Sequence, residues 1–179
     1  METTPAPAPH RSTPPWRYAI GMFGTSIPIN VIKGSMLYFY VSVLGMDAAA
    51  YAGVYAVYGI IDAVDNPVFG YISDRTRSRW GRRRPYLVAG ALLLLGSMIA
   101  LFWVPDAVVA RKTGILVAWF ATFAILSEAS DSLVNASYGA LLPELFPAER
   151  RRALANSLRQ GLQLVAMIIS LGLTPLLAR

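Results

Sequence analysis

The sequence predicts an all-α membrane protein with five transmembrane helices. Of its 179 residues, 55% are hydrophobic and only 15% are charged, whereas a soluble domain carries about 25% charged residues. Five apolar segments are each long enough to cross a hydrocarbon core of about 30 Å, which takes roughly 20 helical residues. The basic residues gather between these segments. These three observations together favour a multi-pass helical bundle.

The elements follow in order along the chain. We expect a disordered tail over residues 1–16, where proline is frequent and no apolar run occurs, and a transmembrane domain over 17–179. The third predicted helix is the plainest, because YLVAGALLLLGSMIALFWV contains no charged residue. Pro28 and Pro67 fall inside predicted helices and remove backbone hydrogen bonds, which predicts kinks. The predicted helices lie near 17–45, 50–72, 84–104, 113–142 and 153–177.

Arginine and lysine indicate how the bundle is oriented. Eleven of them are Arg11, Arg17, the six arginines from Arg75 to Arg84 and the run 150–152, whereas the opposite side has Arg111, Lys112 and Arg179. The positive-inside rule then predicts that the N-terminus and the loops 73–85 and 143–152 are cytoplasmic. We therefore interpret the arginine cluster as an anchor on the cytoplasmic side of a cell (inner) membrane, and not as a nucleic-acid surface.

Six ionisable residues fall inside the predicted spans, where each costs about 2.5–3.5 kcal/mol on insertion scales and therefore normally faces a cavity or a partner. Positions three or four apart share a helix face. This spacing places polar stripes on four helices, and four stripes predict one shared, water-filled cavity, with the third helix outside it. The stripes are Ser26, Asn30 and Lys33; Tyr51, Tyr55, Tyr58, Asp62 and Asp65 with Asn66; Glu128, Asp131, Asn135 and Tyr138; and Asn156, Arg159 or Gln160, and Gln163.

Two of these acids, Asp62 and Asp65, lie within one helical turn. Neighbouring carboxylates repel each other, so we expect a proton or a cation between them. A Na⁺ at this pair is the only metal that the sequence suggests. Glu128 and Lys33 each have a purely structural role as an alternative, as a member of some ion pair in the bundle, and a lysine can also snorkel. For Asn135 and Gln163 a purely structural interhelical hydrogen bond is an alternative.

Three segments resemble a known family. GYISDRTRSRWGRRRPY, which follows a helix bearing DAVDNP, resembles the glycoside–pentoside–hexuronide:cation symporters, a melibiose-carrier-like family of the major facilitator superfamily. YFYVSVLGM (38–46) and YGALLPELFPAERRRALANSLRQ (138–160) are similar to the same family, so the resemblance covers nearly all of residues 18–165. The spacing Gly70-x-x-x-Asp74-Arg75 resembles the superfamily's cytoplasmic loop signature.

The resemblance implies twelve helices in two six-helix halves, and this chain corresponds to most of the N-terminal half. It also implies import of a sugar, glycoside or uronide coupled to Na⁺, Li⁺ or H⁺. By position, Asp62 matches the first acid of the family's helix-two pair, and Asn66 stands in place of the second. Ser26 and Asn135 stand in place of acids of the melibiose branch, and Arg159 matches a helix-five arginine. Because three expected carboxylates are neutral here, proton coupling or no coupling is favoured over Na⁺ coupling.

These inferences define three candidate sites. A cation or proton site comprises Asp62, Asp65 and Asn66. A gating loop comprises Gly70, Asp74, Arg75 and Arg77. The candidate substrate-binding residues are Ser26, Asn30, Lys33, Tyr58, Asp131, Asn135, Arg159 and Gln163.

The sequence predicts a secondary active transporter, or a fragment of one. Its partners would be a sugar-like small molecule, H⁺ or Na⁺, the lipid bilayer and a C-terminal half in the same or another chain, because five helices cannot form a two-half carrier. We expect no cofactor and no nucleic acid. An enzyme is not expected, since the sequence shows no nucleophile–base pair, metal cluster or Gly-rich phosphate loop. Two alternatives use the same fold: a non-transporting assembly subunit, and a lipid or lysolipid carrier.

Overall fold

The predicted all-α fold is confirmed in a computed structural model, which describes residues 13–75, 79, 83–110 and 114–177 and, within these, all side chains except those of 66, 73, 74 and 173–177. The described residues form no β-strand. The elements in chain order are α1 (Pro15–Leu37), the π-helix η1 (Tyr38–Val43), α2 (Ala48–Arg75), α3 (Arg84–Phe102), α4 (Asp106–Ala110), α5 (Gly114–Leu145) and α6 (Glu149–Leu177).

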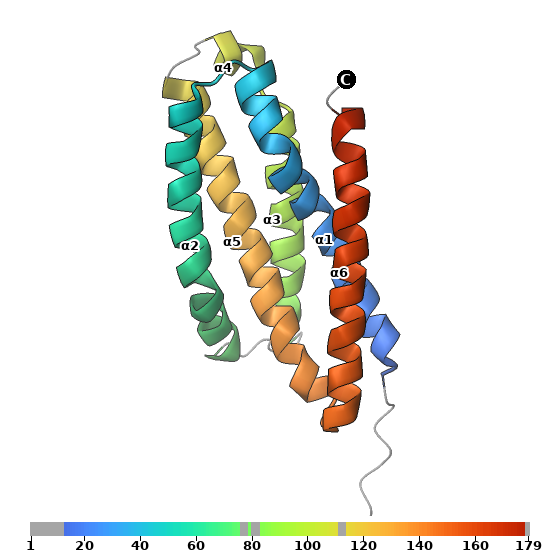
Figure 1. Ribbon diagram of the computed structural model, residues 1–179. Helices are drawn as coiled ribbons and strands as arrows, with labels where there is room; N and C mark the ends of the chain where they lie inside the picture. Colours follow the sequence, from blue (N-terminus) through green and yellow to red (C-terminus); the bar gives the residue numbers. More distant parts are fainter. Residues whose placement is uncertain (1–12, 76–78, 80–82, 111–113, 178–179) are drawn as a thin grey trace, which may run out of the picture.

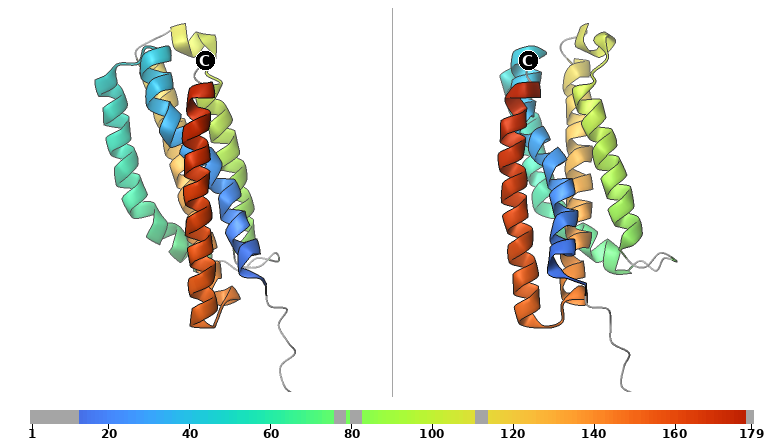
Figure 2. Two further views of the ribbon diagram at one scale, coloured as in Figure 1. Left: turned by 45° about the vertical axis from the view of Figure 1, so that its right-hand side comes forward. Right: turned by 90° about the vertical axis from the view of Figure 1, so that its right-hand side faces the viewer.

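The long helices form an elongated bundle (Figure 1). Helix α5 packs against both α2 and α3, whereas α1 packs mainly against α6. The start of α1, the last turns of α2, the first turns of α3 and the α5–α6 connection lie at one end, and α4 and the end of α6 lie at the other (Figure 2). The described helix ends next to the predicted cytoplasmic segments therefore share one end of the molecule.

Helix α1 begins two residues earlier than predicted, so Pro15 and Trp16 are helical and do not belong to a tail. Proline suits the first turn of a helix because its φ is already helical and its missing N–H needs no partner there. The Arg17 N–H closes this turn on the Pro14 carbonyl at 3.1 Å. Residues 1–12 of the predicted tail lie outside the described part of the chain.

The predicted single helix over 17–45 changes its hydrogen-bonding pattern at Tyr38, where η1 begins. Within η1 the Tyr40 side chain is fully buried, and its hydroxyl donates to the Leu101 carbonyl at 2.9 Å. Its ring centroid lies 4.5 Å from that of Phe120. Gly45 follows with φ of 71°, a left-handed conformation that glycine adopts without steric cost. The end of this segment is thus tied to α3 and α5.

Two connections are shorter than the predicted loops 73–85 and 143–152. Helix α2 continues to Arg75, and α6 begins at Glu149, so the run 150–152 is helical. A basic residue in the last turn and an acidic residue in the first turn both interact favourably with the helix dipole and so stabilise the helix. Helix α5 also continues past Pro143 to Leu145, and the short α4 was not predicted.

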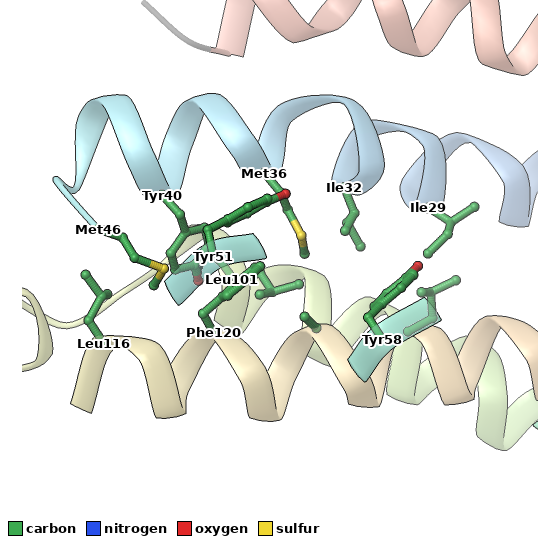
Figure 3. Close-up of a cluster of buried hydrophobic side chains, with 12 residues drawn as sticks. Ile29, Ile32, Met36, Tyr40, Met46, Tyr51, Tyr58, Leu101, Leu116 and Phe120 are labelled. Atoms are coloured by element: carbon green, nitrogen blue, oxygen red, sulfur yellow. Dashed lines mark hydrogen bonds between the residues drawn. The ribbon is translucent and has the colours of Figure 1, made fainter. Parts of the chain in front are cut away.

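The main core joins α1, η1, α2, α3 and α5 around large apolar and aromatic side chains (Figure 3). Many large apolar side chains instead point outward, among them Leu92 and Ile99 of α3 and Ile168 of α6. Within the described residues, α3 and α5 are long and apolar enough to cross a membrane. Long apolar helices with large apolar side chains on their outer surface are the arrangement that a lipid environment favours.

Candidate functional site

A cavity of about 390 Å³ opens between α1, α5 and α6. This volume lies within the range of roughly 300–1,000 Å³ that is usual for small-molecule sites. Most of the residues that line it are polar, in a bundle whose outer surface is largely apolar. The lining residues are Ser26, Ile29, Asn30, Lys33, Asp131, Asn135, Gln160, Gln163, Leu164 and Met167.

Helical spacing explains how the three helices supply this wall, because each contributes residues three or four positions apart. Six of the eight predicted substrate-binding residues lie here; Tyr58 and Arg159 do not. On α6 the sequence pattern did not separate Arg159 from Gln160, and the structure places Gln160 in the wall.

Lys33 connects the cavity to a buried carboxylate. Its Nζ lies 3.5 Å from Oε2 of Glu128, whose side chain is only 1% exposed, whereas that of Lys33 is 39% exposed. The Tyr58 hydroxyl donates to the same Oε2, and Lys33 Nζ lies 5.7 Å from the centroid of the Tyr58 ring. Figure 3 shows Tyr58 reaching from α2 toward α1. Tyr58 therefore contacts both Glu128 and Lys33, although it does not itself line the cavity.

Asp131 brings a second carboxylate to the same region. It lies one turn beyond Glu128 on α5 and interacts electrostatically with Lys33, Glu128 and Asp62. The Asn135 side-chain amide donates a hydrogen bond to the Asp131 backbone carbonyl at 3.1 Å. The cavity wall thus carries one ammonium group and one carboxylate, with amide groups beside them.

Arg159 belongs to a different cluster, on the N-terminal side of the cavity along α1. Tyr18 and Tyr138 hydrogen-bond reciprocally: the Tyr18 hydroxyl donates to the Tyr138 carbonyl at 2.9 Å, and the Tyr138 hydroxyl donates to the Tyr18 carbonyl at 2.5 Å. Their ring centroids are 4.6 Å apart, and Arg159 interacts electrostatically with both tyrosines. This cluster joins α1, α5 and α6 next to the cavity.

Asp62 and Asp65 of the predicted cation site on α2 are not part of the cavity wall, although Asp62 interacts electrostatically with the wall residue Asp131. Asp65 is 8% exposed and Asp62 is exposed, and neither lines the cavity. The side chain of Asn66 lies outside the described part.

Of the predicted gating loop, Gly70 and Arg75 belong to the last turns of α2, and the Arg75 guanidinium lies 4.4 Å from the Tyr71 ring centroid. The Asp74 side chain and residue Arg77 lie outside the described part, so the gating role stays a prediction.

The candidate list from the sequence omitted Glu128 and Gln160, and it contained no apolar wall residue. Glu128 carried a signal, because it begins the polar stripe that continues with Asp131 and Asn135. The apolar residues Ile29, Leu164 and Met167 resemble lipid-facing residues in the sequence, and only the packing of α1 against α6 distinguishes them.

Comparison with known proteins identifies the family. Residues 17–179 match the family model described as MFS/sugar transport protein. An uncharacterized symporter of Synechocystis sp. is 33% identical over 90% of this chain and 30% of its own length. The isoprimeverose transporter of Lactiplantibacillus pentosus is 30% identical over 98% of this chain and 37% of its own length. A putative glycoside/cation symporter of Escherichia coli is 37% identical over 40% of this chain and 15% of its own length.

The chain therefore spans about a third of the length of the first two relatives. The three relatives are named as transporters or symporters, and none is named as an enzyme. The predicted resemblance to melibiose-carrier-like symporters is confirmed by the family match and by these names. The chain belongs to the MFS/sugar transport protein family of multi-pass membrane proteins.

Proposed function

We propose that this chain is the N-terminal part of a secondary active transporter that moves a sugar, glycoside or uronide across the cell membrane together with H⁺ or Na⁺. The observation that carries the proposal is the polar cavity between α1, α5 and α6. The names of the relatives, an isoprimeverose transporter and a putative glycoside/cation symporter, support a sugar-like substrate.

The chemistry of the cavity suits a polyhydroxylated ligand. Sugar hydroxyls both donate and accept hydrogen bonds, and the amides of Asn30, Asn135 and Gln163 offer both donors and acceptors. Lys33 and Asp131 add charge-assisted partners, which form stronger hydrogen bonds than neutral groups do. The three apolar side chains can cover the C–H face of a sugar ring. A lysolipid would need a far more apolar wall, so the lining favours a sugar.

The remaining parts of the proposal concern coupling and topology. Asp62, Asp65 and Asn66 bind the coupling proton or cation, and Gly70, Asp74, Arg75 and Arg77 form the cytoplasmic gating segment. The N-terminus and the connections that follow α2 and α5 face the cytoplasm of an inner membrane. A C-terminal half, in the same or another chain, completes the carrier.

Uptake of radiolabelled sugars by cells that produce the complete carrier tests this proposal. The panel contains isoprimeverose, other neutral glycosides and a uronide. Gln163→Leu removes an amide from the cavity wall, and Asn156→Leu is its control on the same helix outside the wall. A lost hydrogen bond of about 0.5–1.5 kcal/mol predicts roughly two- to tenfold weaker apparent affinity for Gln163→Leu. Uptake of no sugar, or equal affinities for the two variants, would contradict the proposal.

A further inference from the structure

The position of Lys33 is unusual for a residue that only holds two helices together. Its ammonium group lies between the Glu128 carboxylate, which is almost fully buried, and a cavity that is open to a ligand. At this position the ammonium group can contact both the buried carboxylate and a ligand in the cavity. An ion that affects substrate binding must lie where it can contact the substrate, at the edge of the cavity.

We propose that Lys33 is a tethered cation that takes the place of an alkali ion at Glu128, so that the carrier binds its sugar without Na⁺. The inference deepens the proposed function and rests on it, because it chooses between the two proposed coupling ions, H⁺ and Na⁺. The exchangeable charge is then a proton, held by the other carboxylates of the bundle.

The oxygen atoms around the ammonium group support this assignment. Glu128 Oε2 lies 3.5 Å from Lys33 Nζ, and the Tyr58 hydroxyl oxygen is hydrogen-bonded to Oε2. A carboxylate next to a hydroxyl is the oxygen-rich environment that hard cations bind. The tethered ammonium group always supplies the positive charge there, whereas a bound ion would bind and dissociate.

The charges on the neighbouring helices agree with this role. Helix α5 presents Glu128 and Asp131, and Asp62 of α2 interacts electrostatically with Asp131. Helix α6 contributes the uncharged Gln160 and Gln163 to the same wall. Removing the ammonium group would leave Glu128 as a buried carboxylate without its cation, and such a charge recruits a counter-ion or a proton.

Binding of ²²Na⁺ to the purified chain in nanodiscs, at constant ionic strength with choline, tests the proposal. Wild type should bind no Na⁺ at this position, and Lys33→Met should bind one Na⁺ per chain. Lys33→Arg keeps the charge and should bind none. The double variant Lys33→Met/Glu128→Gln removes the partner carboxylate and should also bind none.

Three outcomes would overturn the proposal. They are Na⁺ binding by wild type that Lys33→Met does not increase, absence of Na⁺ binding by folded Lys33→Met, and equal Na⁺ binding by the single and double variants. Thermal melting in NaCl and in choline chloride checks folding. Lys33→Met should be stabilised by Na⁺ specifically, and its failure to fold in Na⁺ also overturns the proposal, because an alkali ion then cannot replace the lysine.

Sugar binding to the complete carrier separates this inference from the proposed function. Wild type should bind sugar equally in NaCl and in choline chloride, and Lys33→Met should bind it only in NaCl. If no sugar binds to wild type while the ²²Na⁺ results are as expected, the proposed function fails and the tethered cation stands. If sugar binds to wild type only in NaCl, the tethered cation fails and the proposed function stands.

Discussion

Gly90 determines how closely α3 approaches α5, and replacing it should weaken the bundle. A Cβ atom at this position would lie 2.7 Å from Cγ2 of Val134 and 3.2 Å from the backbone carbonyl oxygen of Ser130. The carbonyl oxygen cannot yield without moving α5, so Gly90→Ala overpacks the interface. Overpacking costs about 1–3 kcal/mol, and the better helix propensity of alanine offsets about 1 kcal/mol of this.

The net loss of up to about 2 kcal/mol should lower the midpoint of thermal unfolding by up to roughly 8 °C, because a chain of this size shifts by about 2–4 °C per kcal/mol. Circular dichroism of the purified chain in detergent measures this. Gly96→Ala is the matched control, since a Cβ there meets nothing within 4 Å on the same helix. Val134→Ala should partly rescue Gly90→Ala in a double-mutant cycle. Equal midpoints for Gly90→Ala and Gly96→Ala would refute the packing argument.

Three further predictions concern the tyrosine pair, coupling and topology. Gly21→Ala would displace the Tyr138 hydroxyl from the Tyr18 carbonyl, and thermal melting should show a loss of about 1 kcal/mol of stability. Gly24→Ala is the control, because a Cβ there meets nothing within 4 Å and should lower stability by nothing. Equal effects of the two substitutions would contradict this prediction. Asp62→Asn should abolish sugar accumulation against a gradient but leave downhill exchange, and accumulation at the wild-type level would exclude Asp62 from coupling. Ser78→Cys should react with an impermeant maleimide only from the cytoplasmic side, so labelling from outside in intact cells would overturn the orientation.

The sequence was sufficient to predict the long helices, because their apolar lengths and polar stripes are local properties. It was less able to predict where they end. The Glu149 turn and the last turn at Arg75 extend the helices into what the charge pattern suggested were loops. The π-helix at Tyr38 depends on contacts of Tyr40 with α3 and α5, which no local pattern reveals.

The candidate site was predictable to the extent that one helix face determines it. Helical spacing alone grouped Ser26, Asn30 and Lys33, and the structure places all three in one cavity wall. Spacing cannot say how a helix is rotated against its neighbours. For this reason Arg159 was expected in the wall and instead lies with the tyrosine pair. The contact between Lys33 and Glu128 was not predicted, because the sequence assigned neither residue a particular ion-pair partner.

The 179 residues of this chain contain no cysteine, which allows the most direct test of the proposed sugar-binding cavity. Gln163→Cys places one thiol in the cavity wall, and Arg151→Cys places one on an exposed turn of the same helix. The rate of N-ethylmaleimide labelling is measured with and without sugar in the complete carrier, in which any cysteine of the C-terminal half has been replaced by serine. We predict that sugar at ten times its Kd slows labelling of Gln163→Cys about tenfold by mass action and leaves Arg151→Cys unchanged. Equal labelling of Gln163→Cys with and without a sugar that the carrier transports would contradict the assignment of this cavity.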